Sequence, residues 1–590
     1  MALIPPLVAW ILVSGLDDLV LVVALALTWA RRRLCGGGTL PSDTDLRTKP
    51  EKRIAILIPL WREAGVIGRM VEHNLSAIRY RSYDLFIGGY PNDEATVEAV
   101  RDLEARFPNV HLALCPHDGP TSKADCLNSI YQRLILDEER RSVRYDVLVT
   151  HDAEDVVHPD SLRWINYYIG EFDMVQVPVL PLPTPFRLLT HGVYCDEFSE
   201  YQTKDMPVRQ ILEGFIPSNG VGTGYSRRAV ELLAGDASNR IFEPTSLTED
   251  YENGLRLKLM GCRQAFLSST QWTRTPVATR EYFPQTARQA VRQRTRWVMG
   301  ITLQSWERHG WRGGWRQVYW LWRDRKGLVG NLLTIASNLI CLWGAFTWLL
   351  CRMTGVAWLL PASIHPSLRP FLGAAVLLPF LHMGVRAVCV GRFYGWAFAA
   401  GVPIRTVWAN WLNFAATVCA LWRYAASRLE HRTPDWLKTA HEYPSHSSLR
   451  PVRRLLGELL TEAGIITRGQ LEYALVSTPR GVRIGEHLVE LGWLTESQLY
   501  EALSIQASLP LGELRPAEIQ RNACRALPAR FARDWKVVPF KIMSGSLLLA
   551  AAELPPEDLL RELREFTRLE IRFQLVTASN FETLAREALR

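Results

Sequence analysis

The sequence predicts an α/β domain with a mostly parallel sheet, joined to α-helical transmembrane segments and a small C-terminal α+β domain. Residues 50–270 alternate short β-rich runs with helical patterns, as expected for a parallel sheet flanked by helices. Apolar residues are concentrated near the N-terminus and between about 327 and 426. From about residue 449 the chain is polar, with leucines at helical spacing. A length of 590 residues suits two or three domains.

The first predicted element is a membrane anchor over residues 1–34. Residues 3–30 are almost wholly apolar, and the basic residues follow them at 31–33 instead of preceding them, as they would in a signal peptide. The arginines are therefore expected on the cytoplasmic side. Asp17 and Asp18 interrupt the run, and a carboxylate at the centre of a spanning helix costs about 2.5–3.5 kcal/mol. We expect them to face a protein cavity, or the segment to lie partly in the interface.

The α/β domain follows a polar linker at 41–49. Its predicted strands are 53–60, 83–89, 110–115, 145–150 and 174–179. In such sheets ligands bind where the strands end, so the residues after each strand are the candidate site.

Further membrane segments are predicted after the α/β domain. Residues 331–351 are long and apolar enough to cross a bilayer. Residues 371–391 form the next candidate, and their two basic residues, His382 and Arg386, are expected to face a pore or a bundle. If both soluble domains lie on one side of the membrane, an even number of crossings must separate them. We therefore expect 404–426 to lie in the interface.

Polar residues follow the second and third predicted strands. Asp93 comes directly after the second, where it could bind a ligand, although an Asn-Asp pair in this position is more often a turn or helix cap. Lys123 opens a helix after the third, where a lysine and free backbone N–H groups can bind phosphate. A capped surface helix would look the same.

Three acidic residues follow the fourth strand, in the string His151-Asp152-Ala153-Glu154-Asp155. A divalent cation with a diphosphate would neutralise their mutual repulsion, although a solvated acidic loop is the simpler alternative.

Two later strings complete the candidate site. Glu249 and Asp250 open a helical run, and Asp250 could be an N-terminal cap or could take a proton from a sugar hydroxyl. The string Gln293-Arg294-Thr295-Arg296-Trp297 offers guanidinium groups for a pyrophosphate and an indole for a sugar ring.

In this order the motifs resemble the family-two processive glycosyltransferases, the group of cellulose, chitin and hyaluronan synthases, over roughly residues 50–310. The resemblance implies a GT-A fold, a UDP-sugar donor and an inverting hexosyltransferase that needs Mg²⁺ or Mn²⁺. The implied roles are Asp93 at the uridine, Asp152 and Glu154 at the metal and diphosphate, Asp250 as general base, and Gln293, Arg294, Arg296 and Trp297 at the diphosphate and acceptor. Lys123 and Glu249 are further candidate substrate-binding residues. The family's D-x-D is Asp152-Ala153-Glu154 here, followed by Asp155, so the identity of the metal-binding carboxylates is open.

Over almost the whole chain the sequence resembles more closely the inner-membrane glycosyltransferases of the phage-adsorption protein B (NfrB) type. The shared strings are at 89–93, 119–125, 151–155 and 436–439, with His441 and Pro444. This resemblance implies a bacterial inner-membrane protein whose catalytic and C-terminal domains are cytoplasmic. It also implies an exopolysaccharide passed to a periplasmic or outer-membrane export partner.

An internal repeat marks the C-terminal region. Leu455-Leu456-Gly457 and Arg483-Ile484-Gly485 each lead to a second glycine seven residues on, and leucines follow in step at 471 and 475, and at 499 and 503. The pattern resembles the N-terminal domain of MshE-type secretion ATPases, which implies cyclic di-GMP as an allosteric ligand. The candidate ligand-binding residues are Arg454, Leu456, Gly457 and Gly464 in the first copy, and Arg483, Ile484, Gly485, Leu488, Gly492, Leu499, Leu503 and Gln506 in the second. The first copy is degenerate, with Leu455 in place of arginine and Thr478 in place of glutamine, and two plain helical hairpins are the alternative.

The predicted divisions are therefore an anchor at 1–34, a transferase domain at 50–310, membrane and interfacial helices at 327–430, and a cyclic di-GMP-sensing domain at 449–590. The expected partners are a UDP-sugar, the growing polysaccharide, cyclic di-GMP and the bilayer, with no nucleic-acid polymer. The ten cysteines include no C-x-x-C pair or Cys/His cluster at zinc spacing. Transfer of one sugar to a lipid carrier and a non-catalytic membrane scaffold remain the alternative functions.

Overall fold

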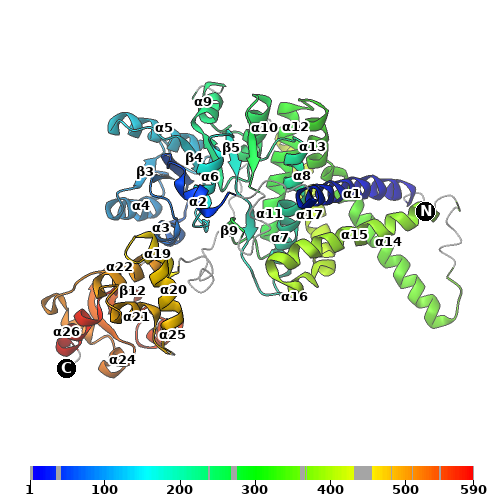
Figure 1. Cartoon of the computed structure of the whole chain (residues 1–590). Coiled ribbons are helices and arrows are strands. Elements are labelled where there is room, and N and C mark those ends of the chain that lie inside the picture. Colours follow the sequence, from blue (N-terminus) through cyan, green and yellow to red (C-terminus); the bar gives the residue numbers. More distant parts are fainter. Residues whose placement is uncertain are drawn as a thin grey trace. The chain divides into compact units, whose positions relative to one another are not determined.

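A computed structural model describes residues 4–34, 41–236, 239–267, 276–358, 366, 369–430, 455–479, 481–507, 509–543 and 546–588 (Figure 1). The chain divides into two compact units. The first comprises residues 1–70 and 79–443, and the second comprises 71–78 and 444–590.

A seven-stranded sheet of order β3-β2-β1-β4-β7-β5-β8 forms the centre of the first unit. Its strands are β1 (Ile54–Pro59), β2 (Tyr83–Gly89), β3 (Val110–Leu114), β4 (Val147–Thr150), β5 (Met174–Gln176), β7 (Thr223–Ser226) and β8 (Gln264–Phe266). All pairs are parallel except those that β7 makes with β4 and β5. The mostly parallel α/β sheet predicted from the sequence is therefore confirmed, with β7 and β8 as additional strands.

Helices lie between these strands, because a parallel connection requires a crossover. They are α3 (Ala64–Ala77), α4 (Glu94–Arg106), α5 (Lys123–Arg141), α6 (Ser161–Tyr168), α9 (Arg227–Asp236) and α10 (Glu249–Leu259). The start of α5 is fixed by Ser122, whose side chain accepts a hydrogen bond from the Asp125 N–H. This cap places Lys123 on the first turn of the helix.

A second layer connects the sheet to the membrane helices. It consists of the two-stranded sheet of β6 (Val179–Pro181) and β9 (Thr279–Glu281), and of α7 (Leu189–Glu200), η1 (Tyr201–Asp205), α8 (Met206–Ile211), α11 (Ala287–Trp297), η3 (Val298–Gln304), α12 (Ser305–His309) and α13 (Trp315–Arg325). Both η1 and η3 are π-helical. Short π-helical insertions occur often at functional sites, and both of these border the cavity described below.

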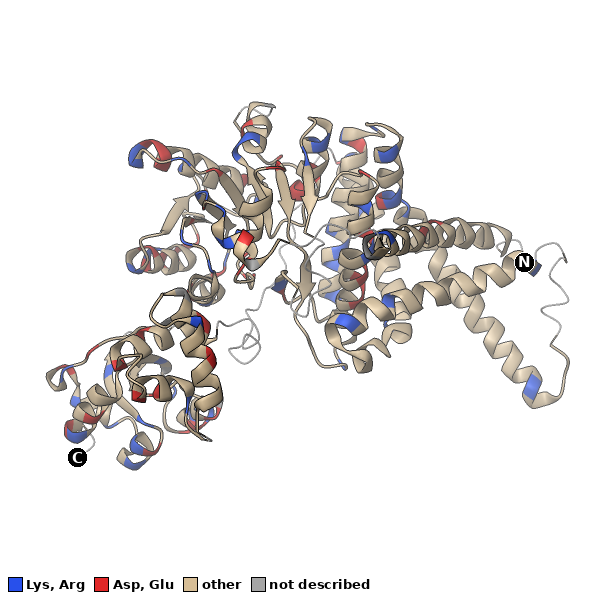
Figure 2. Cartoon of the chain, viewed as in Figure 1, with Lys and Arg blue, Asp and Glu red and all other residues tan. Residues whose placement is uncertain are grey.

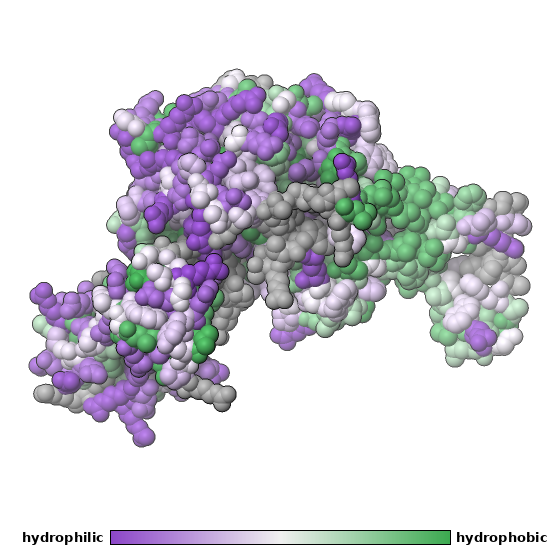
Figure 3. Space-filling model, in the orientation of Figure 1, coloured by the Kyte–Doolittle hydropathy of each residue, from purple (hydrophilic) through white to green (hydrophobic). Residues whose placement is uncertain are grey.

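Three helices among the described residues are long and apolar enough to cross a membrane. They are α1 (Ile4–Leu34), α14 (Gly327–Thr354) and α15 (Arg369–Tyr394). They lie at the end of the first unit opposite β3 (Figure 1). Their surface is mostly apolar (Figure 3), and charged residues are few along their length (Figure 2). The predicted presence of helices long and apolar enough to cross a membrane is therefore confirmed.

The two aspartates of α1 are turned toward protein groups. Asp17 accepts hydrogen bonds from Tyr319 (2.7 Å) and Lys326 (2.8 Å), and Asp18 lies 3.1 Å from both Arg323 and His382. The sequence left two alternatives, that these carboxylates face a protein cavity or that the segment lies partly in the interface. In the structure they face protein groups. Their ion pairs offset the desolvation that an isolated carboxylate would suffer.

The segment expected at 404–426 is part of a longer helix, α17 (Val402–Leu429), which follows the short α16 (Trp396–Ala399). Its buried residues recur at helical spacing and face the rest of the unit. Arg405 among them is fully buried and makes a bidentate ion pair with Asp196 of α7, with both distances at 2.8 Å. The interfacial location of α17 stays a prediction.

The second unit contains a helical half and an α/β half. The helical half comprises α19 (Leu456–Glu462), α20 (Arg468–Ser477), α21 (Ile484–Glu490) and α22 (Glu496–Ala507). The α/β half comprises η6 (Pro516–Glu518), α23 (Arg521–Cys524), α24 (Ala529–Asp534), β10 (Val537–Met543), β11 (Ser546–Ala551), α25 (Glu557–Phe566), β12 (Glu570–Leu575) and α26 (Ala578–Ala588), with sheet order β10-β11-β12. This is the small α+β domain that the sequence predicted.

Candidate functional site

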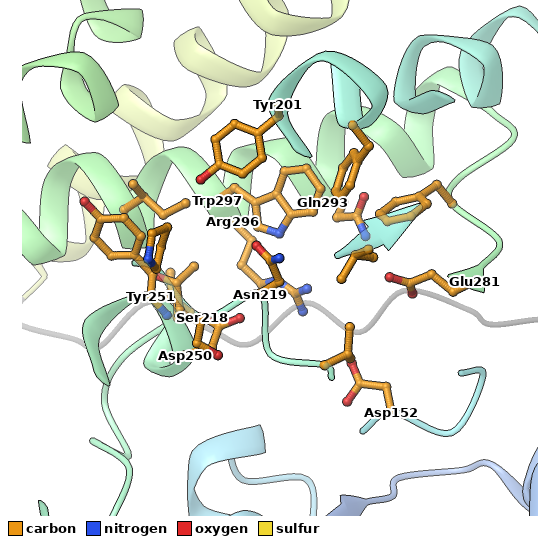
Figure 4. A pocket seen from close by; sticks show the side chains of 18 of the residues that line it. Asp152, Tyr201, Ser218, Asn219, Asp250, Tyr251, Glu281, Gln293, Arg296 and Trp297 are labelled. Atoms are coloured by element: carbon orange, nitrogen blue, oxygen red, sulfur yellow. Dashed lines mark hydrogen bonds between the residues drawn. The ribbon is translucent and has the colours of Figure 1, made fainter. Parts of the chain in front are cut away.

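A cavity of about 650 Å³ lies where β1, β2 and β4 end. Figure 4 shows that side chains from distant parts of the chain surround it. It gathers eight of the ten residues predicted for the transferase site, namely Lys123, Asp152, Glu154, Glu249, Asp250, Gln293, Arg296 and Trp297. Asp93 and Arg294 are not among the residues that line it. The parallel sheet explains the gathering, since its strands end at one edge.

Lys123 and Asp152 form an ion pair on one side of the cavity. The Lys123 Nζ atom lies 2.7 and 2.8 Å from the two carboxylate oxygens of Asp152. Burial alone would lower the pKa of Lys123, but Asp152, Glu249 and Asp250 together raise it above its usual range. Lys123 is therefore a fixed positive charge, suited to a phosphate group at the start of α5.

The structure separates the roles of the three acids after β4. Asp152 and Glu154 line the cavity. Asp155 is fully buried, its Oδ2 atom lies 2.7 Å from His151 Nδ1, and it accepts a hydrogen bond from the Asp152 N–H (3.0 Å). Burial lowers the pKa of His151 to about 4, so this ring is neutral near pH 7. Asp155 thus holds the loop, whereas Asp152 and Glu154 are the two carboxylates that line the cavity.

The donor set fits a divalent cation that arrives with its substrate. Among the described residues there is no group of three or more His, Cys, Asp or Glu side chains that could hold a metal ion. Mg²⁺ is usually held by one or two carboxylates and completes its shell with substrate phosphates and water. Asp152 and Glu154 supply those two carboxylates.

Glu249 and Asp250 form an acidic pair at the start of α10. Asp250 Oδ1 accepts a hydrogen bond from the Tyr251 N–H (2.8 Å). A Cβ atom at Gly220, which has φ +79°, would lie 2.6 Å from Asp250 Oδ2 and 3.3 Å from Lys123 Nζ. Only a glycine therefore leaves room for this carboxylate and for the lysine beside it.

Burial perturbs both acids of this pair. Burial and the Asp250 carboxylate raise the pKa of Glu249 to about 7. Burial also raises the pKa of Asp250, although Lys123 and Arg296 oppose the rise. A carboxylate with a raised pKa is a better proton acceptor than an ordinary surface aspartate.

The string at the end of α11 divides between two faces of the helix. Gln293, Arg296 and Trp297 line the cavity, as Figure 4 shows. Arg294 is instead buried, where its guanidinium makes a bidentate contact with Glu197 (2.8 and 3.2 Å) and donates to Asn413 (2.6 Å). Arg294 thus links α11 to α7 and α17. From the sequence we expected it to line the site with Gln293, Arg296 and Trp297, and the structure does not place it there.

Helical spacing separates these faces, but it does not say which face meets the cavity. Residues 293, 296 and 297 share one helix face, whereas 294 points elsewhere.

Asp93 connects two strand ends beside the cavity. It precedes α4 but makes no capping hydrogen bond there, and it accepts a hydrogen bond from the Arg62 N–H (2.5 Å) after β1. Arg62 has φ +55°, which is uncommon for a residue with a side chain. Trp61 and Tyr90, which were not predicted, line the cavity here with ring centroids 5.4 Å apart. Their position directly after two strands was the available signal.

The cavity also extends to the membrane helices. Ser14, Asp18, Lys326, His382 and Arg386 line this inner part, with Glu200, Lys204 and Asp205 of the second layer. His382 and Arg386 both contact Glu200, at 3.1 and 2.7 Å. Burial would raise the pKa of Glu200, but Arg386, His382 and Lys204 keep it well below its usual range. His382 and Arg386, expected to face a pore or a bundle, thus face the cavity and Glu200.

The repeat of the second unit folds twice in the same way. Gly464 and Gly492 adopt positive φ of 70° and 69° after α19 and α21. At the start of α20 the backbone N–H groups of Thr467 and Gln470 each donate to the side-chain oxygen of the other residue, and Thr495 and Gln498 do the same at the start of α22. The two copies are therefore equivalent helical hairpins.

The predicted cyclic di-GMP residues divide between core and surface. Leu488 and Leu499 lie in the helical core, and Leu456 packs against it. A Cβ atom at Gly457 would lie 2.4 Å from Leu471, and one at Gly485 would lie 2.6 Å from Leu499. Ile484 and Leu503 pack against this core, and Gln506 is half-buried. Arg483 remains exposed at the start of α21. Arg454, together with the 436–439 string, His441 and Pro444, lies outside the described residues.

Comparison with known proteins gives matches for both units. Residues 50–300 match the family described as glycosyltransferase like family 2, and residues 507–590 match the MshEN domain. The chain is 34% identical to the bacteriophage adsorption protein B of Escherichia coli K12, over 97% of this chain and 79% of that protein. It is 31% identical over 129 residues to the type IV pilus assembly ATPase PilB of Thermus thermophilus, which is 21% of this chain and 14% of that protein.

Two solved structures are also similar. A structure of MshE with cdg is 29% identical and covers 23% of this chain and 99% of its own, with a TM-score of 0.21. The mannosyltransferase PcManGT from Pyrobaculum calidifontis, in complex with GDP-Man and Mn²⁺, is 15% identical and covers 68% and 99%, with a TM-score of 0.41.

Proposed function

Since this chain belongs to the family of bacteriophage adsorption protein B and is a family-two glycosyltransferase, we propose that it polymerises a sugar from a UDP-sugar into an exported exopolysaccharide. The observation that supports this most strongly is the single cavity at the sheet edge. It brings together two carboxylates for a cation, fixed cations for a diphosphate, an acidic pair with raised pKa values, and a tryptophan.

In the proposed reaction an acceptor hydroxyl attacks the anomeric carbon of the donor sugar on the face opposite the diphosphate. Asp250 accepts the hydroxyl proton, the new glycosidic bond forms, and UDP leaves, so the anomeric configuration inverts. Lys123 and Arg296 stabilise the charge that develops on the diphosphate. When bound by Asp152 and Glu154, Mg²⁺ or Mn²⁺ would neutralise the same diphosphate. Trp297 offers a flat surface for the acceptor sugar.

A processive enzyme needs a route for its product. The cavity continues from the catalytic acids to the membrane helices, which supports a product that leaves toward the bilayer, and the string from Gln293 to Trp297 favours a polymer over one sugar on a lipid carrier. We propose that the polymer passes outward to a periplasmic or outer-membrane partner, and that both soluble domains are cytoplasmic. A reporter fused at Ser447 is expected to read cytoplasmic, and a periplasmic result would refute this topology.

The test of the transferase is UDP release by the purified protein with a panel of UDP-sugars. Asp250→Asn should abolish turnover and leave UDP binding intact, because it removes the base and keeps the nucleotide contacts. Asp102→Asn, the same change on the exposed surface of α4, is the matched control. Absence of UDP release with every donor would favour the scaffold, and a product with one added sugar would favour transfer to a lipid carrier.

The second unit supports a regulatory role. We propose that it binds cyclic di-GMP through its repeated hairpins, with Arg483 as the main polar contact, and that ligand binding changes the rate of transfer. Calorimetric titration of the full-length protein tests this. No saturable heat, or no loss of binding in Arg483→Ala, would defeat the proposal and favour a protein-docking module.

A further inference from the structure

The arginine assigned above to cyclic di-GMP already has a partner within the chain. Arg483 Nη2 lies 2.8 Å from Oε2 of Glu553. The other oxygen of the same carboxylate accepts a hydrogen bond from Lys536. These hydrogen bonds, together with the two positive charges, lower the pKa of Glu553, so its carboxylate is ionised at neutral pH.

The ion pair joins the two halves of the second unit. Arg483 immediately precedes α21 in the helical half, and Glu553 follows β11 in the α/β half. Each half has its own hydrophobic core. Polar contacts between the halves include the Tyr500 hydroxyl, which donates to the Ala552 carbonyl (2.7 Å). A change at Arg483 is therefore a change at this junction.

The Glu553 carboxylate and a cyclic dinucleotide both offer hydrogen-bond acceptors to a guanidinium. A guanidinium binds a carboxylate, a phosphodiester or the acceptor edge of a guanine through similar pairs of N–H donors. Arg483 cannot direct the same donors to Glu553 and to a ligand at once. A ligand that takes the Nη2 donors of Arg483, the ones that contact this carboxylate, therefore displaces Glu553.

We propose that Glu553 is an internal competitor of cyclic di-GMP, and that displacement of its carboxylate releases the contact between the two halves. The inference rests on the proposed binding of cyclic di-GMP by this unit. It goes beyond that function because it assigns a residue of the α/β half, outside the repeat, to the control of affinity. Lys536 keeps the carboxylate paired after release, so displacement leaves no isolated charge.

The expected change in affinity is small because both side chains of the ion pair are partly exposed to water. The side chains of Arg483 and Glu553 are 65% and 35% exposed, and ion pairs of this kind contribute little because water screens them. Loss of the competitor should therefore tighten binding about two- to fivefold.

The test is titration of the purified full-length protein with cyclic di-GMP. Glu553→Gln should lower the Kd about two- to fivefold, whereas Glu518→Gln, at an exposed acid of the same half, should leave it unchanged. Glu553→Gln should not restore binding to Arg483→Ala, because the competitor acts only through that arginine. Lys536→Met should weaken binding, since Glu553 would then be held by Arg483 alone.

The possible results are distinguishable. If wild-type protein binds cyclic di-GMP and neither Glu553→Gln nor Lys536→Met changes the Kd, the role of Glu553 as a competitor is refuted. The proposed binding of cyclic di-GMP would stand. Binding by Glu553→Gln alone would support the competitor strongly. No binding by any variant would overturn the competitor together with the proposed ligand.

Discussion

Gly220→Ala is the change whose effect on catalysis follows most directly from the structure. The new methyl group would lie 2.6 Å from Asp250 Oδ2, well inside an ordinary contact. The carboxylate or the loop must then move by almost an ångström, and a misplacement of about 1 Å can lower a rate about 100-fold. An L-residue with φ near +79° adds roughly 1–2 kcal/mol of backbone strain. We expect kcat to fall about 100-fold with little change in UDP affinity.

The assay is UDP release at saturating donor, with UDP binding measured on the same preparations. Gly65→Ala in α3 is the matched control, because no atom lies within 4 Å of the added Cβ and its backbone has no positive φ. This control should retain wild-type turnover. Turnover of Gly220→Ala within about threefold of wild type would refute the argument, since a misplaced base must cost far more.

Further outcomes are expected for the pH dependence, for the buried ion pair and for the divalent cation. Because Asp250 acts as the base only when deprotonated and burial raises its pKa, the acid limb of the turnover profile should lie at higher pH than the pKa of an ordinary surface aspartate would give. Lys123→Met should move this acid limb to higher pH, since the lysine lowers the pKa of Asp250, and an unmoved limb would contradict the pairing. Arg405→Met should destabilise the first unit by about 3–5 kcal/mol, and the double variant with Asp196→Leu should recover much of that loss in thermal melts. Chelation of divalent cations should stop turnover, and Mn²⁺ binding followed by electron paramagnetic resonance should be lost in Asp152→Asn and retained in Asp155→Asn.

Much of the catalytic site could be predicted because its residues follow strand ends. Asp152 and Glu154 come directly after β4, and the geometry of a parallel sheet brings such positions to one edge. The role of Asp155 could not be predicted in this way. Three adjacent acids look equivalent in sequence, and only the burial of His151 against Asp155 separates the third from the other two.

For the membrane helices, the sequence predicted the spans but not their polar contacts. The apolar lengths of α1, α14 and α15 were evident from composition, because a bilayer requires about 20 apolar residues. Their polar partners were not, because the ion pair of Asp17 with Lys326 joins residues more than 300 positions apart. The periodic pattern of apolar residues along a sequence cannot predict a contact between residues so far apart.

The sequence by itself determined the alternation of strands and helices, the apolar spans, the order of the catalytic motifs and the C-terminal repeat, since each is a local pattern of residue types. Only the tertiary structure decided which of those residues share a space. It turned Arg294 toward Glu197 and Arg296 toward the cavity, and it joined Arg483 to Glu553 across two halves. Side-chain direction and long-range pairing depend on how the elements pack, and packing is a property of the whole chain.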